Sequence, residues 1–88
     1  MIDEQKLTEG LNKLTGNDLI AVEREERAVG NTFPTLNFTT SYQARLAARA
    51  LGMNVYDITA LPAREFNRVI QIVVGFLFNS DASTSADK

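Results

Sequence analysis

The sequence predicts an all-α protein: a small bundle of three to four helices with an aromatic loop and a disordered polar C-terminal tail. Three observations favour this fold class. Apolar residues recur at helical spacing in several segments. Glycine and proline stand where such helices would end or begin. The 88 residues leave room for one domain, which we place at residues 1–79, followed by a tail at residues 80–88. That tail is polar and has too few apolar side chains to become ordered by burial.

The first expected helix covers residues 3–14. Its apolar residues fall at i, i+4 and i+7, and they are Leu7, Leu11 and Leu14. Gly10 lies in the middle of this helix and should weaken it by about 1 kcal/mol relative to alanine.

The second expected helix begins after Thr15 and runs to about Val29, before Gly30. Thr15 and Asp18 have the spacing of a capping box, in which each residue satisfies a free backbone group of the other. The side chains expected to face the core are Leu19, Ile20, Val22 and Val29. The charged run EREER at residues 23–27 is interpreted as a solvated helix face.

Residues 31–41 are not expected to be helical, because Pro34 lacks an N–H and favours extended geometry at Phe33. The large side chains of this segment are Phe33, Leu36 and Phe38. We expect them to fold back on the core, with a short extended piece at residues 35–39. A mobile aromatic recognition loop is the alternative.

The third expected helix is capped by Thr39, Thr40 or Ser41 and runs to Leu51. Its apolar stripe consists of Tyr42, Leu46, Ala47, Ala50 and Leu51, and its alanines allow a close helical neighbour. Gly52 is placed to end it in a left-handed conformation. Asn54 or Asp57 then begins one more helical turn that ends by Leu61.

The last expected helix starts at Pro62 and reaches about Asn79. Residues 69–78 are apolar at eight of ten positions. At 100° per residue the apolar arc spans about 240°, whereas a surface helix needs only somewhat more than 100°. The face assigned to the core consists of Phe66, Val69, Ile70, Val73 and Leu77. The flanks, with Ile72, Val74, Phe76 and Phe78, are therefore the best candidates for a partner-binding surface.

Composition argues against catalysis. The chain has no Cys and no His, so thiolate chemistry, the usual general base and the commonest metal ligand are absent. No glycine-rich phosphate loop occurs. We therefore expect no enzyme activity, no cofactor and no metal.

The charge is unevenly distributed over a chain with a net charge of −2. Residues 1–30 have seven acidic and four basic side chains, while residues 31–79 have four arginines and two acids. We interpret these charges as ordinary solvated faces, since exposed ion pairs contribute little. The alternative is that the two parts attract each other, within one subunit or between two. The arginine pairs 45/49 and 64/68 are interpreted as solvent-facing, with a phosphate or acidic-partner clamp as the alternative.

Residues 44–61 superficially resemble a DNA-reading helix-turn-helix, which gives the second functional hypothesis, a small phage-encoded transcriptional regulator. A recognition helix needs hydrogen-bonding side chains at its start. Here that helix would be VYDITAL, with an acid, no base, and Pro62 directly after it. Together with the acidic net charge, this argues against nucleic-acid binding.

Three stretches resemble the small tail assembly chaperones of long-tailed bacteriophages, including those of prophages. They are LTGNDLIAVERE at 14–25, SYQARLAARALGMNVYDITALPAREFNRV at 41–69, and IVVGFLF at 72–78, together about 50 residues. The matching pattern is a Leu-Pro step, an acidic-aromatic pair at Glu65 and Phe66, and a final apolar helix. Glu65 replaces the commoner Asp of that pair.

The resemblance implies a self-associating helical protein that holds the aggregation-prone tape measure protein while the tail tube assembles. It would act in the host cytoplasm and be absent from the mature virion, without cofactor, membrane or nucleic acid. An apolar surface that can be covered reversibly would serve this role. The predicted partner-binding residues are Ile72, Val74, Phe76 and Phe78 of the last helix, with Phe33 and Phe38 of the loop.

Overall fold

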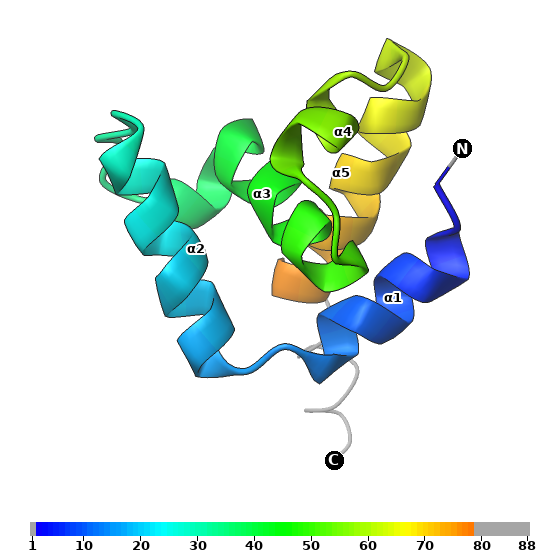
Figure 1. Cartoon of the computed structure of the whole chain (residues 1–88), viewed down its shortest axis with the longest axis horizontal. Coiled ribbons are helices and arrows are strands. Elements are labelled where there is room, and N and C mark those ends of the chain that lie inside the picture. The colour runs from blue at the N-terminus through cyan, green and yellow to red at the C-terminus, as the bar shows by residue number, and fades with distance from the viewer. Residues whose placement is uncertain (1, 79–88) are drawn as a thin grey trace.

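A computed structural model describes residues 2–78, and it confirms the predicted all-α class. Within that range the chain forms five α-helices, one 3-10 turn and no strand (Figure 1). The elements are α1 (Glu4–Lys13), α2 (Gly16–Ala28), η1 (Leu36–Phe38), α3 (Thr40–Leu51), α4 (Val55–Thr59) and α5 (Ala63–Phe78). The predicted tail at 80–88 and the predicted helix end at Asn79 lie outside the described residues.

Helix α3 is the centre of the molecule and contacts α1, α2, α4, α5 and the η1 turn. Figure 1 shows α2 on one side of α3 and α1 and α5 on the other. Side chains on several faces of α3 are buried: Tyr42, Gln43, Ala44, Leu46, Ala47 and Ala48. The predicted stripe is thus confirmed at its first three positions, and the small alanines bring the neighbouring helices close.

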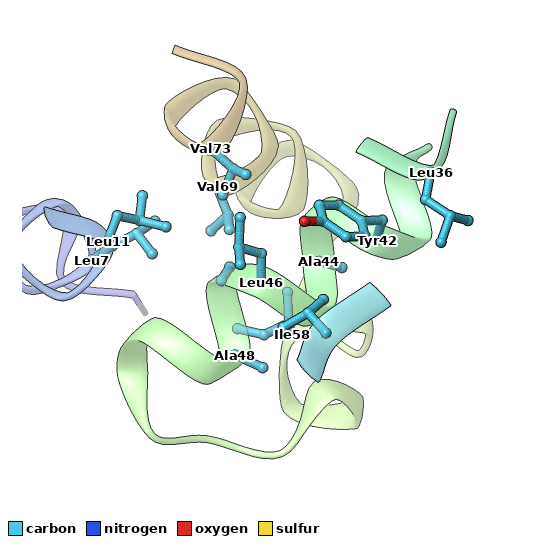
Figure 2. Close-up of a cluster of buried hydrophobic side chains, with 12 residues drawn as sticks. Leu7, Leu11, Leu36, Tyr42, Ala44, Leu46, Ala48, Ile58, Val69 and Val73 are labelled. Carbon is cyan, nitrogen blue, oxygen red and sulfur yellow. The ribbon is translucent and has the colours of Figure 1, made fainter. Parts of the chain in front are cut away.

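The apolar core forms around Leu46. Figure 2 shows Leu46 between the α1 leucines, the α5 valines and Ile58 of α4. The fully or almost fully buried members from these elements are Leu7, Leu11, Leu46, Ile58, Val69 and Val73. Phe66, Ile70 and Leu77 pack against this cluster and are partly buried. The core face predicted for the last helix therefore lies where it was expected.

Helix termini follow the predicted capping residues closely. The Thr15 backbone N–H donates to Asp18 Oδ2 at 2.8 Å, as expected for the capping box. Of the three candidate caps of α3, Thr39 is the one used, and it accepts from the Tyr42 N–H. Gly52 ends α3 with φ +69°, and Asn54 caps α4. The side chains of Asp18, Thr39 and Asn54 each accept from a backbone N–H that would otherwise lack a partner.

Gly10 has a role that the sequence reasoning missed. A Cβ atom at this position would collide with the backbone carbonyl of Ala50 in α3. Glycine therefore lets α1 approach α3 more closely than any other residue would, and this contact offsets its low helix propensity.

Four local predictions are wrong. Ile20 and Val29 were expected in the core, but each side chain is more than half exposed. Only Val22 and Glu26 of α2 are buried, because α2 packs chiefly on α3. Residues 36–38 form a 3-10 turn in place of the extended piece, and α5 begins at Ala63, one residue after Pro62.

Candidate partner-binding surface

An exposed pair of aromatic rings joins two distant parts of the chain. The rings of Phe38 and Phe78 stack with centroids 5.0 Å apart and planes 6° apart. Yet 63% of Phe38 and 37% of Phe78 remain exposed. Such pairs contribute about 0.5–1.5 kcal/mol beyond their buried area. The structure therefore brings one predicted loop residue and one predicted residue of the last helix into a single apolar surface.

A buried side chain and hydrogen bonds fix the η1 turn, which includes Phe38. Leu36, two residues earlier, is buried and packs in the core cluster. The Phe38 N–H donates to the Thr35 carbonyl at 3.0 Å, and the buried Gln43 side chain donates to the Asn37 carbonyl at 3.0 Å. On the other side of Phe38, the Thr39 N–H donates to the Leu36 carbonyl at 2.8 Å. These contacts fix the turn, while the Phe38 ring stays exposed. The expectation that Phe38 folds back on the core is wrong, whereas for Leu36 it is correct.

A surface hollow of about 270 Å³ lies beside the η1 turn, between α2, the turn and the end of α5. Its apolar lining comes from α2, η1, α3, α5 and the segment before η1, and consists of Leu19, Pro34, Leu36, Tyr42 and Leu77; the polar lining is Glu23, Thr35 and Asn37. Helices and peptides commonly bind where an apolar depression has a polar edge.

The other predicted residues lie elsewhere. Ile72 and Phe76 line a second hollow, where α5 meets Leu11 of α1, and both pack against the core cluster. Val74 is partly buried, and Phe33 is about half exposed. The expected burial of Phe33 is therefore wrong. The partner-binding roles of these four residues stay predictions, while Ile72 and Phe76 also contribute to the α1–α5 packing.

Arginines on α3 and α5 connect the basic and acidic parts of the chain. Arg45 pairs with Glu26 at 2.7 Å and Glu25 at 3.6 Å, Arg49 with Asp18 at 2.9 Å, and Arg68 with Glu4 at 3.0 Å. Each pair joins an acid from residues 1–30 to an arginine from residues 31–79. Attraction between the two parts, which the sequence analysis gave as the alternative to ordinary solvated faces, therefore exists within one chain. The solvent-facing interpretation is wrong for Arg45, whose side chain is 18% exposed.

Glu26 is a buried charged residue that the sequence analysis did not identify. It was assigned to a solvated face, but its side chain is completely buried. Oε2 accepts from Arg45 Nε at 2.7 Å and Oε1 accepts from Asn31 Nδ2 at 2.8 Å. Its i+4 spacing from the buried Val22 was the signal that could have placed it on the inner face.

Hydrogen bonds and charges shift the pKa of several carboxyl groups. Burial acts to raise the pKa of Glu26, but hydrogen bonds from Asn31, Arg45 and Ser41 together outweigh it and lower that pKa. The Thr15 backbone N–H, followed by Arg49, lowers the pKa of Asp18. A hydrogen bond from Arg68 lowers the pKa of Glu4. All three groups are therefore held in the ionised form, as structural ion pairs require.

The described part of the chain offers little chemistry beyond these contacts. Among residues 2–78 no group of three or more acidic side chains is arranged to hold a metal ion. No helix in the same range is long and apolar enough to cross a membrane. The helix-turn-helix-like segment ends in α4, which has only five residues, and Arg45 and Arg49 before it are in ion pairs.

Comparison of the chain with protein-family models, with curated proteins and with solved structures finds no match. The aromatic pair and its neighbouring hollow are therefore the basis for assigning a function.

Proposed function

We propose that the protein is a bacteriophage tail assembly chaperone, which binds the tape measure protein and keeps it soluble while the tail tube assembles. The exposed ring pair Phe38–Phe78 is the observation that carries this proposal. Large aromatic side chains are usually buried in a small domain, and exposed ones are typical of contact sites. The resemblance of residues 14–25, 41–69 and 72–78 to such chaperones supplies the identity of the client.

The arrangement suits a helical client. A long helix of the tape measure protein would place apolar side chains on the ring pair and in the hollow beside η1. Only burial is needed, so the protein would act without catalysis or a cofactor. Because the contact is small and partly polar at its edge, it would be released as the tail tube polymerises. Such a chaperone works in the host cytoplasm and is absent from the mature virion.

The same surface would support self-association when no client is present. Two copies could cover each other's ring pairs, which removes apolar area from water. We therefore expect a concentration-dependent oligomer that the client competes with. Light scattering that shows a monomer at high micromolar concentration would count against this part of the proposal.

Co-expression with the tape measure protein tests the proposal. The chain is co-expressed with a long, helical tape measure protein, and the soluble fraction of this client is measured. The double variant Phe38→Ser/Phe78→Ser should leave helicity intact and return most of the client to the insoluble fraction, since both rings are exposed.

Tyr56→Ser is the matched control for this experiment. Tyr56 is also an exposed aromatic residue, at 73%, but it lies on α4 in a different surface hollow with Val29 and Met53. This variant should keep the client soluble. The proposal is wrong if the wild-type chain leaves the client insoluble, or if Tyr56→Ser abolishes solubility as strongly as the double variant does.

A further inference from the structure

The side-chain amide of Asn31 uses both of its hydrogen atoms inside the protein. Nδ2 donates to Glu26 Oε1 at 2.8 Å and to Thr39 Oγ1 at 3.3 Å. Its other atom, Oδ1, accepts from the Phe33 N–H at 3.1 Å. An asparagine amide has two donor hydrogens, so this side chain is fully used as a donor.

The bond between Asn31 and Thr39 joins the two ends of the segment that connects α2 to α3. Asn31 is the third residue after α2, and Thr39 is the cap of α3. Thr39 Oγ1 in turn donates to the Leu36 carbonyl at 2.7 Å, within the turn that precedes it. Arg45 of α3 binds the buried Glu26 carboxylate at 2.7 Å. The group that accepts from Asn31 is therefore itself fixed in place.

We propose that Asn31 is a positioning residue for the partner-binding surface: it closes the loop 31–39 and thereby places Phe38 on Phe78. Asn31 acts on the rings indirectly: it bonds to Thr39, and Thr39 bonds to the Leu36 carbonyl in the η1 turn that carries Phe38. The consequence for client binding rests on the proposed function, whereas the consequence for the ring pair does not.

Aromatic NMR of the intact chain tests the inference. Cross-peaks between the Phe38 and Phe78 rings report their contact directly, since the ring centroids are 5.0 Å apart. Asn31→Ala should abolish or strongly reduce these cross-peaks while the far-ultraviolet circular dichroism stays helical. Client binding should weaken about five-fold, because the stacked ring pair is no longer held in place for the client.

Asn37→Ala is the matched control, because it changes the same residue type in the same loop. The contact that Asn37 provides to Gln43 comes from its backbone carbonyl, which the substitution keeps. It should leave the ring cross-peaks unchanged. A second control, Leu11→Ala, lowers stability through α1 and should keep the cross-peaks below its melting temperature. Loss of the cross-peaks in Leu11→Ala would mean that general destabilisation, and not Asn31, controls the ring contact.

Two further outcomes overturn the inference. One is full ring cross-peaks in folded Asn31→Ala, and the other is their equal loss in Asn37→Ala. If Asn31→Ala does not fold, Asn31→Ser is used, since its hydroxyl still accepts from the Phe33 N–H but is too short to bridge Glu26 and Thr39. Failure of the wild-type chain to bind the client would contradict the proposed function alone, because the cross-peaks decide the positioning role independently.

Discussion

The two sides of α3 are built differently. Toward α1 and α5, α3 meets aliphatic side chains, and these three helices all contact one another. Toward α2 and the η1 turn, the buried residues include the charged Glu26 and the polar Gln43, and hydrogen bonds hold the chain in place. Apolar packing supplies most stability, whereas buried polar groups fix one arrangement. The exposed ring Phe38 lies on the polar side, where position matters more than burial.

The largest effect is expected on the apolar side. Leu7 is completely buried between α1 and the core, so Leu7→Ala should lower the free energy of unfolding by about 2–5 kcal/mol. Val29→Ala, directly after α2, is the control, since Val29 is mostly exposed, and it should change this value by less than about 0.5 kcal/mol. Denaturant titration measures both. Equal losses would show that the two sides of α3 do not differ as described.

Gly10→Ala should lower the free energy of unfolding by about 1–3 kcal/mol, because the added Cβ meets the Ala50 backbone. Gly75→Ala makes the same change inside α5, where a Cβ meets nothing within 4 Å. That variant should gain about 0.5–1 kcal/mol from better helix propensity. Thermal unfolding compares the two variants. A stabilised Gly10→Ala would refute the close α1–α3 approach.

Acid should weaken the polar side selectively. The pKa of Glu26 in the folded protein is below its ordinary value of 4.5, so its ionised form stabilises the fold. This contribution is complete above about pH 4.5 and is lost as the pH falls through the lowered pKa. Glu26→Gln should have a lower free energy of unfolding at pH 7 than the wild type. Its stability should also fall less steeply below pH 4.5 than that of the wild type. Asp18 and Glu4, whose pKa values are also lowered, should keep some acid sensitivity. An unchanged pH profile would contradict the role given to Glu26.

The smallest effect is expected for the ion pair between α1 and α5. Arg68 and Glu4 form two hydrogen bonds of 3.0 Å, but both side chains are at least half exposed. Solvent and salt screen such a pair, so Arg68→Gln should be hard to distinguish from wild type in a denaturant titration. A clear loss that persists in 1 M salt would show that this pair stabilises the apolar side more than its exposure suggests.

Local signals were enough to predict most of the fold. The side chains of Asp18, Thr39 and Asn54 accept from backbone N–H groups within three residues of them, so their roles are visible in the sequence. Gly52, which ends α3 in a left-handed conformation, is visible in the same way. Gly10 meets Ala50 and Glu26 pairs with Arg45, both on α3 and 40 and 19 positions away, and no local pattern indicates these two contacts. For the same reason, the wide apolar arc of α5 indicated more apolar surface than the core requires, but it could not indicate that Phe78 would stack on Phe38.

Hydrogen–deuterium exchange of the chain, alone and with the tape measure protein, tests the central claim most directly. The account predicts that the client slows exchange in the Leu36–Phe38 turn and in the last turn of α5, which carry the ring pair. Exchange in α4 around Tyr56 should not change. Protection confined to α1 or α4, with none at Phe38 and Phe78, would contradict the assignment of the partner-binding surface.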